Sequence, residues 1–304
     1  MQKFLIVVVG PTGIGKTKTS IEIAKHYNTE IISADSRQIF KELKIGTATP
    51  TEDELKEARH HNIGSQSIHD YYSAWEFEQD ALRLSEELFK THDQLVLTGG
   101  SMLYIDAICK GIDELPTIDQ QLREDLKKQY ETEGIESIRR LLKQLDPVFY
   151  EQVDLMNHKR VIHAVEICLI TGKTYSSLRT NTIKKRPFHI IKVGLELERE
   201  EVYNRINLRV DQMIKMGLVE EARQFYPYKE LNSLNTVGYK EIFAHFDGEY
   251  DLDKAIELIK RNTRRYAKKQ LTWFKKDSET KWFKPTEFNN IISHIDGLIL
   301  NCKA

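Results

Sequence analysis

The stretch GPTGIGKT at residues 10–17 has the glycine, lysine and threonine spacing of a phosphate-binding loop. The glycines allow the backbone to turn its N–H groups towards phosphate oxygens. Lys16 provides a mobile positive charge for terminal phosphates, and the Thr17 hydroxyl is expected to hold Mg²⁺. The predicted phosphate-binding residues are Gly10, Pro11, Thr12, Gly13, Ile14, Gly15, Lys16 and Thr17. The stretch therefore predicts a site for a diphosphate or triphosphate.

Two other polar residues follow segments with strand-like sequences. Asp35 follows residues 30–33, and its carboxylate could bind Mg²⁺ through water or accept a proton from a nucleophile. The alternative is an exposed loop acid. Ser101 follows Gly99 and Gly100, which permit close approach of a ligand to the backbone. Its hydroxyl would either hydrogen-bond to that ligand or cap the helix that follows.

The segments 4–9, 30–33 and 94–98 are short and apolar, and they alternate with helix-like segments. Such alternation predicts an α/β fold, a P-loop NTPase-like parallel sheet flanked by helices. Ligands bind at the carboxyl ends of strands in such sheets, so the loop, Asp35 and Ser101 should meet in one crevice. The segment 94–98 lacks the terminal acid with which motor ATPases help to hold Mg²⁺. This absence favours a transferase over a hydrolytic motor.

The residue composition changes after residue 115. Residues 117–186 are rich in charged side chains, Gln and Leu and read as helical, with breaks at Gly134, Pro147 and Gly172. Strand character returns at 189–195, which we expect to rejoin the sheet. The predicted domains are a P-loop catalytic core at 1–114 and 188–304, and an all-helical insertion domain at 115–187.

The 304-residue chain has a net charge of −1 and 40% hydrophobic residues, as expected of a globular protein. Its three cysteines lie far apart, outside any metal-ligand spacing, which indicates reduced thiols and a cytoplasmic protein. No apolar stretch is long enough to span a membrane. The segment 254–276, however, contains nine Lys or Arg and one acid. This basic segment predicts contact with a polyanion; the alternative is a solvated helix face.

Eight motifs occur in order along the chain: GPTGIGKT (10–17), ADSRQIF (34–40), IGTATP (45–50), TGGSMLY (98–104), LDP (145–147), HKRVIHAVE (158–166), GYKE (238–241) and TRRYAKKQLTWF (263–274). Together they resemble the tRNA dimethylallyltransferase family, also called tRNA isopentenyltransferases, over nearly the whole chain. The last motif is the most telling, because many families share phosphate-binding loops.

The resemblance implies transfer of a dimethylallyl group from dimethylallyl diphosphate to the N6 amine of the adenosine at tRNA position 37, with release of diphosphate. Asp35 would accept the proton of the amine, and Ser101 would orient the adenine. Lys16, Arg209, the loop amides and Mg²⁺ on Thr17 would stabilise the departing diphosphate. The adenine would leave the anticodon-loop stack to reach the pocket.

The resemblance also implies that the helical insertion and the basic C-terminal helix grip the anticodon stem-loop of tRNA through phosphates and shape. The implied tRNA-contacting residues are Asp35, Ser36, Arg37, Gln38, Ser101, Arg123, Lys159, Arg160, Val161, Ile162 and His163. Three residues depart from the family pattern: His163 stands where Arg is usual, Phe40 where Tyr is usual and Thr49 where Lys is usual. These departures concern the strength of the tRNA grip. We expect a monomer with no membrane contact.

Three other functions are compatible with parts of the sequence. A small-molecule P-loop kinase would share the loop and a strand-end acid, but it would have no use for the basic C-terminal segment. A prenyltransferase acting on free adenine nucleotides would share the chemistry without an RNA-binding surface. A non-catalytic RNA-binding protein would not need the intact loop, Asp35 and Ser101.

Overall fold

The computed structural model describes residues 2–116, 119–180 and 182–303. It contains two compact units, a sheet unit (Met1–Cys109 with Lys185–Ala304) and a helical unit (Lys110–Lys184). The sequence places the insertion at 115–187, and the assignment of separate roles to the two units remains a prediction. Within the described residues, no helix combines the length and the apolar character needed to span a bilayer.

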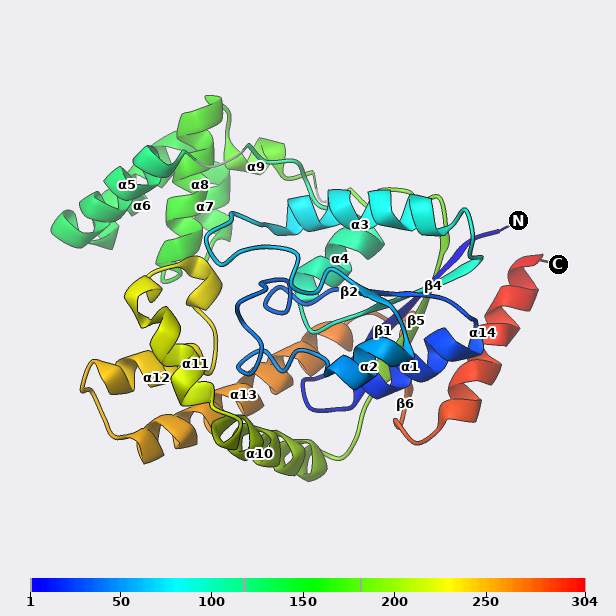
Figure 1. Ribbon diagram of the computed structural model, residues 1–304. Coiled ribbons are helices and arrows are strands. Elements are labelled where there is room, and N and C mark those ends of the chain that lie inside the picture. Colours follow the sequence, from blue (N-terminus) through cyan, green and yellow to red (C-terminus); the bar gives the residue numbers. More distant parts are fainter. Residues whose placement is uncertain (1, 117–118, 181, 304) are drawn as a thin grey trace. The chain divides into compact units, whose positions relative to one another are not determined.

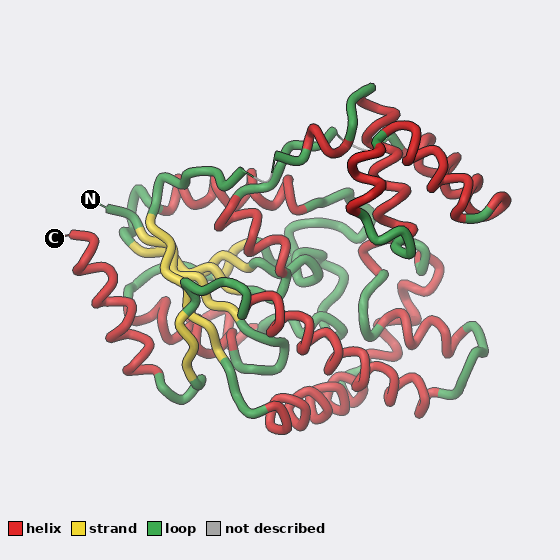
Figure 2. Tube along the Cα trace, turned by 180° about the vertical axis from the view of Figure 1, so that it is seen from behind, coloured by secondary structure: helices red, strands yellow, loops and turns green. Residues whose placement is uncertain are grey.

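The sheet has six strands, all parallel, in the order β3-β2-β4-β1-β5-β6, and they are coloured yellow in Figure 2. The strands are β1 (Phe4–Val9), β2 (Ile31–Ser33), β3 (His60–His61), β4 (Gln94–Thr98), β5 (His189–Leu195) and β6 (Lys281–Phe283). The predicted parallel sheet is confirmed, and β5 pairs with β1, with Phe4 opposite His189. The edge strands β3 and β6 were not predicted, because two or three residues are too few to show a sequence period.

Strand β1 is buried on both faces, which explains its uninterrupted apolar sequence. Phe4, Ile6 and Val8 pack with residues of α1 (Lys16–His26) and α14 (Phe288–Lys303). Leu5 and Val7 face the opposite way, towards α3 (Ala74–Leu88) and α4 (Met102–Lys110). Figure 1 shows these two helical layers on either side of the sheet. The sheet is therefore a rigid platform for the loops at its carboxyl edge.

A third layer of helices packs against the long loop after β2, residues 34–50. It comprises α10 (Arg199–Lys215), α11 (Leu218–Phe225), α12 (Tyr239–Phe246) and α13 (Leu252–Phe274), with short 3₁₀ helices at Tyr226–Tyr228 and Asn232–Leu234; α2 (Glu52–Glu57) follows the loop. Ile39 and Leu43 of the loop are buried in one apolar cluster with Tyr239, Ile242 and Ile259. This packing holds the loop that begins at Asp35 in a defined position.

The helical unit contains α5 (Gln120–Glu133), α6 (Ile135–Leu145), α7 (Pro147–Gln152), α8 (His158–Thr171) and α9 (Tyr175–Leu178). Its helices break where the sequence predicts. Gly134 (φ 79°) and Gly172 (φ 65°) end helices in conformations with positive φ, and Pro147 begins α7. Asp146 is fully buried; its carboxylate caps α7 and also accepts hydrogen bonds from Ser176.

Candidate active site

The loop between β1 and α1 has a geometry that only its glycines allow. Gly10, Gly13 and Gly15 have φ values of 151°, 80° and 106°, which side chains with a Cβ disfavour. A Cβ on Gly10 would also lie 2.8 Å from the carbonyl oxygen of Leu195 on β5. The loop therefore packs closely against the neighbouring strand, and helix α1 begins directly after it at Lys16.

The Lys16 ammonium is held against the loop itself. It donates hydrogen bonds of 3.0 Å to the carbonyl oxygens of Gly10 and Pro11. Burial lowers the pKa of Lys16 to about 8; the Asp35 carboxylate opposes this shift, and the Arg209 guanidinium adds to it. The charge of Lys16 is thus close to titration at neutral pH, and an added anionic ligand would favour the charged form.

Asp35 lies at the same edge of the sheet as the loop. It follows β2, and its Oδ1 accepts hydrogen bonds from the backbone N–H groups of Arg37 (2.9 Å) and Gln38 (3.3 Å). Asp35 favours the charged forms of both Lys16 and Arg209, so the three groups lie within electrostatic range of one another. Oδ2 makes no hydrogen bond to the described residues and is directed to a point beside Gly100, where a Cβ would lie 3.5 Å away.

Arg209 projects from α10 towards the loop. Its guanidinium lies 3.4 Å from the Thr12 hydroxyl and 3.5 Å from the Ala48 carbonyl oxygen. Burial lowers its pKa, while Asp35 counteracts the shift. On local sequence alone, a surface arginine on a helix is the better interpretation of Arg209; the tertiary structure instead places this cation beside the phosphate-binding loop.

Ser101 does not cap its own helix through its side chain. Its hydroxyl accepts a hydrogen bond from the backbone N–H of Ser36 (2.7 Å) and pairs with the Ser36 hydroxyl (2.8 Å). A Cβ on Gly99 would lie 2.0 Å from the Ala34 carbonyl oxygen, so the turn after β4 packs directly on the loop after β2. Ser101 and Asp35 are therefore parts of one continuous polar surface.

Gln270 is a site residue that sequence reasoning missed. It lies on α13 within the motif at 263–274, its side chain is 1% exposed, and it contacts both the phosphate-binding loop and Gly100. Tyr266, one turn earlier, also donates to the Gly100 carbonyl oxygen (3.2 Å). The signal that could have revealed Gln270 is a polar residue on the apolar face of a helix.

Comparisons with known proteins agree with this geometry. A family model described as IPP transferase matches residues 38–277. The chain belongs to the IPP transferase family. It is 56% identical to tRNA dimethylallyltransferase 1 of Bacteroides fragilis, over 98% of this chain and 99% of the relative. It is 34% identical to the solved tRNA isopentenylpyrophosphate transferase of Bacillus halodurans, with a TM-score of 0.71, over 99% of this chain and 96% of that one. The family assignment makes the chain an enzyme, a prenyltransferase.

A more distant solved structure supports the fold alone. It is a eukaryotic dimethylallyltransferase captured acting on tRNA, 24% identical, with a TM-score of 0.78 over 95% of this chain and 75% of that one.

Members of the family usually need a divalent metal. Within the described residues, no three His, Cys, Asp or Glu side chains come together as metal ligands. Mg²⁺ commonly needs only one or two protein ligands, because substrate phosphates and water complete its shell. Thr17 suits that arrangement, since it is half-buried in the first turn of α1 and its hydroxyl bonds to none of the described residues. The residues present therefore fit a metal held mainly by its substrate.

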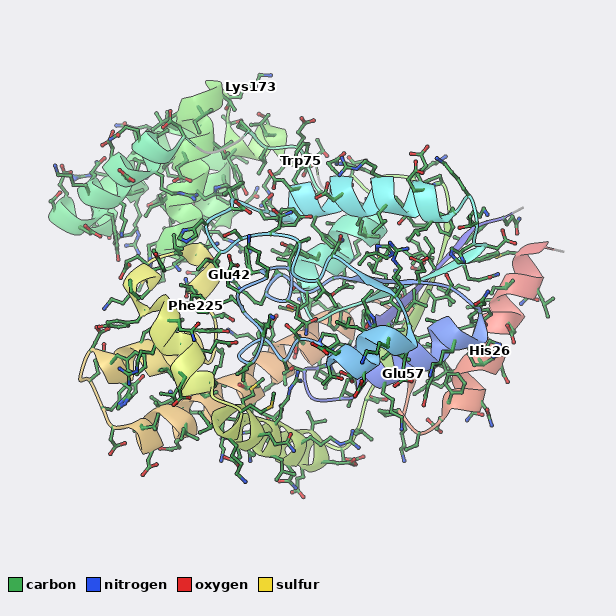
Figure 3. The ribbon with its side chains drawn as sticks, in the orientation of Figure 1. His26, Glu42, Glu57, Trp75, Lys173 and Phe225 are labelled. Atoms are coloured by element: carbon green, nitrogen blue, oxygen red, sulfur yellow. The ribbon has the colours of Figure 1, made fainter. Side chains whose placement is uncertain are left out.

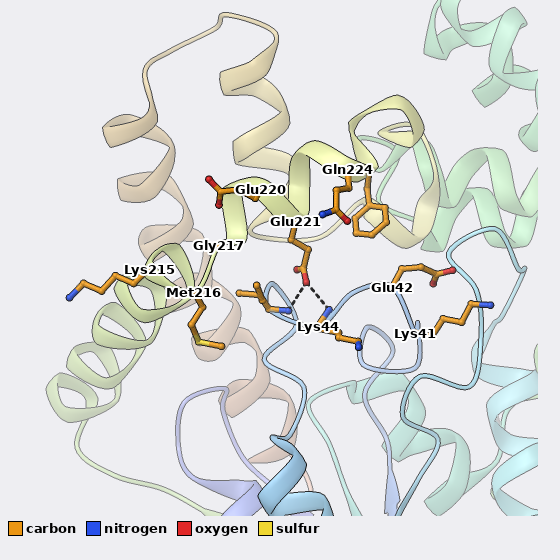
Figure 4. A pocket seen from close by; sticks show the side chains of 11 residues that line it. Lys41, Glu42, Lys44, Lys215, Met216, Gly217, Glu220, Glu221 and Gln224 are labelled. Atoms are coloured by element: carbon orange, nitrogen blue, oxygen red, sulfur yellow. Dashed lines mark hydrogen bonds between the residues drawn. The ribbon is translucent and has the colours of Figure 1, made fainter.

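A cavity of about 790 Å³ lies elsewhere in the sheet unit, between α10–α11 and residues 41–45. Glu42 and Phe225, labelled in Figure 3, both line it. Figure 4 shows Glu221 at its centre, with its carboxylate bound to the backbone N–H groups of Lys44 (3.2 Å) and Ile45 (2.9 Å). Glu221 thus holds residues 44 and 45 in place, and the cavity, which is lined by residues other than those of the sheet-edge site, is separate from that site.

Several predicted tRNA-contacting residues lie in the helical unit. Arg123 makes a bidentate ion pair with Glu166 (2.7 and 2.9 Å). The Glu166 side chain is fully buried, whereas that of Arg123 is partly exposed. Burial would raise the pKa of Glu166, but hydrogen bonds from His163 and Arg123 outweigh it and hold the pKa below its usual value. Val161 is fully buried in the unit's core. An RNA contact of Val161 stays a prediction; in this structure the residue packs with Ile138 and Val165.

The other predicted contacts in α8 remain predictions. Lys159 and Arg160 are exposed in its first turn, and Ile162 and His163 are half-buried. The N-terminus of a helix carries partial positive charge, and Asn157 caps this one through the backbone N–H of Arg160 (3.2 Å). Two cations and a helix N-terminus together form an electropositive surface.

The basic segment 254–276 is less isolated than its sequence indicates. Acids from other elements pair with it: Asp211 pairs with Lys260 (2.5 Å) and Glu196 pairs with Lys275 (2.7 Å). Arg265, Lys268 and Lys269 remain exposed on α13 without an ion pair to the described residues. Arg261 and Lys276 are likewise exposed without an ion pair to the described residues, so the surface that could bind a polyanion is smaller than the sequence indicates but still runs from residue 261 to residue 276.

Proposed function

We propose that this protein transfers a dimethylallyl group from dimethylallyl diphosphate to the N6 amine of adenosine 37 in tRNA, and releases diphosphate. The observation that carries the proposal is the position of Asp35 after β2, where its carboxylate lies beside Gly100 and acts electrostatically on Lys16 of the phosphate-binding loop and on Arg209 of α10. Relatives covering almost the full chain, such as that of Bacteroides fragilis, are named tRNA dimethylallyltransferases.

The reaction requires positive charge where the diphosphate leaves and a proton acceptor where the adenine amine attacks. The bond between C1 of the prenyl group and the diphosphate oxygen breaks, and its electron pair leaves with the diphosphate. A bond forms between that carbon and N6, and the N6 proton moves to Asp35. Lys16, Arg209 and the loop N–H groups stabilise the charge of the leaving group. Ser101 and Ser36 provide hydroxyl groups beside Asp35, where the adenine would be oriented.

The metal we propose is Mg²⁺, with Thr17 as its protein ligand. When bound, it neutralises part of the diphosphate charge. The protein's own cations, Lys16 and Arg209, would neutralise the rest of the diphosphate charge. This division explains how the site functions without a cluster of metal-binding acids among the described residues.

We further propose that the substrate is recognised at the anticodon stem-loop. Lys159 and Arg160 in the helical unit, and Arg265, Lys268 and Lys269 in the sheet unit, would contact backbone phosphates. Arg37 and Gln38 follow Asp35 and lie on the side of the site where we propose that the adenine binds. Arg37 is bound to backbone carbonyl oxygens at Asn232 and Ser233, so it contributes by shaping the loop.

The proposal is tested by a transfer assay. The protein is incubated with Mg²⁺, dimethylallyl diphosphate and an RNA stem-loop carrying adenosine at position 37, and the RNA is weighed by mass spectrometry. One prenyl group should be added, and none to RNA with guanosine at that position. Parallel reactions with ATP and with free AMP as acceptor test the kinase and nucleotide-prenyltransferase alternatives. Absence of a mass gain on the stem-loop would reject the proposal.

We also propose that the protein acts as a cytoplasmic monomer. All three cysteines are thiols, and Cys109 and Cys168 are buried, as expected in a reducing compartment. Light scattering coupled to size-exclusion chromatography measures the mass directly. A mass near 35.5 kDa is expected.

A further inference from the structure

Gln270 connects two parts of the active site that lie far apart in the sequence. Its Oε1 accepts a hydrogen bond from the backbone N–H of Thr12 (2.8 Å), in the phosphate-binding loop. Its Nε2 donates to the carbonyl oxygen of Gly100 (2.8 Å), in the turn that carries Ser101. Thr12 N–H can only donate and the Gly100 carbonyl can only accept, so the amide orientation is determined by its partners.

Gly100 has little free space around it, with Gln270 on one side and Asp35 on the other. A Cβ there would lie 2.7 Å from Nε2 of Gln270 and 3.5 Å from Oδ2 of Asp35. The Gly100 backbone is therefore placed between the helix α13 and the proposed proton acceptor. Any movement of Gln270 would shift this turn, and Ser101 with it.

We propose that Gln270 is a positioning residue, which sets the separation between the phosphate-binding loop and the Gly100–Ser101 turn. This inference rests on the proposed function. It also assigns the Thr12 N–H to Gln270, so that phosphate binding relies on the other amides of the loop. Loss of the contact should then lower the rate of transfer more than the affinity for the diphosphate.

Gln270→Glu is a sharp test, because the side chains have the same shape. A neutral carboxylic acid can still accept from Thr12 and donate to Gly100, but a carboxylate places negative charge against the Gly100 carbonyl oxygen. Because Gln270 is 1% exposed, burial should raise the pKa of the introduced carboxyl well above its usual value. We therefore expect the ratio of variant to wild-type kcat to fall about tenfold between about pH 6 and about pH 8.5. The Kd of dimethylallyl diphosphate, measured by calorimetry, should change far less than kcat at the lower pH.

Gln270→Met removes both hydrogen bonds without adding charge. Its kcat should fall by about tenfold at every pH, with no recovery in acid. Two control variants accompany it. Gln224→Glu makes the same chemical change at an exposed position on α11 that bonds to none of the described residues. Tyr266→Phe removes the second donor to Gly100 but leaves Gln270 in place, and should retain most of kcat.

The outcomes separate this inference from the proposed function. If the wild-type protein transfers no prenyl group, the proposed function fails. If the wild-type protein is active and Gln270→Met keeps its kcat, or the Gln270→Glu ratio is independent of pH, the positioning role is rejected. The positioning role is also rejected if Gln270→Met unfolds at a lower temperature but keeps the wild-type kcat per molecule of folded enzyme. That result would indicate a purely structural contact.

Discussion

The carboxyl edge of the sheet and the first turn of α8 both gather charged side chains, but they do so in different ways. At the sheet edge, Lys16 and Arg209 are held at least half-buried by backbone carbonyls and a hydroxyl, and both lie within electrostatic range of Asp35. On α8, Lys159 and Arg160 are exposed. A catalytic site needs charges fixed at short range, whereas a phosphate-contacting surface needs only accessible positive charge.

The largest expected effect concerns Asp35, and it tests whether the two regions are separable. Asp35→Asn retains the shape and one hydrogen-bond acceptor but cannot take the proton, so kcat should fall by about a thousandfold. The Kd for the stem-loop RNA, measured by fluorescence anisotropy, should be unchanged. Turnover within about tenfold of wild type would remove Asp35 from the role of base.

Lys16 should show the next largest effect and a distinctive pH dependence. Lys16→Ala should lower kcat/KM for dimethylallyl diphosphate by about a hundredfold. In the wild-type protein the ammonium loses its proton as pH rises through about 8, so kcat/KM should decline above that value. Lys16→Arg keeps its charge and should remove this decline, whatever its absolute rate. A decline of the same shape in both proteins would assign it to another group.

Arg123 distinguishes stability from RNA binding within the helical unit. Arg123→Ala leaves the buried Glu166 carboxylate with a weaker set of partners, which should destabilise the unit by about 1–3 kcal/mol, less than for a fully buried pair because Arg123 is half exposed. Chemical denaturation monitored by circular dichroism measures this loss. In the wild-type protein the lowered pKa of Glu166 contributes stability above the ordinary carboxyl range, which is lost as pH falls through the folded-state pKa. If the denaturation midpoint of Arg123→Ala is unchanged, the ion pair does not stabilise the unit, and RNA binding is left as the predicted role of Arg123.

The smallest expected effects belong to the exposed cations. Lys159→Glu and Arg160→Glu should each raise the KM for the stem-loop by about tenfold or less, with kcat unchanged, and should reduce the dependence of affinity on salt. Lys173→Glu is the matched control, because Lys173 is equally exposed in the same unit but lies after the end of α8. Equal effects in all three variants would indicate net charge rather than a defined contact.

Much of the chemical site could be predicted from local sequence. The loop at residues 10–17 needs glycines at specified positions, and Asp35 and Ser101 each follow a strand, so the parallel topology brings them together. The strands β4 and β5 were predicted with their observed bounds, because Leu, Val and Ile predominate in each. The short edge strands, which have no period of their own, depend on their neighbours for hydrogen-bond partners.

By itself, the sequence determined the parallel sheet, the phosphate-binding loop and the identity of the acid beside it, since these depend on backbone conformation and on the order of elements. Only the tertiary structure showed that Gln270 lies at the site, that Val161 belongs to a core and that Asp211 and Glu196 pair with the basic helix. Arg209 was expected at the site from the family resemblance, but not from its local sequence. The reason is physical: these contacts join residues far apart in the chain, and a helical side chain's partners depend on which face the fold buries.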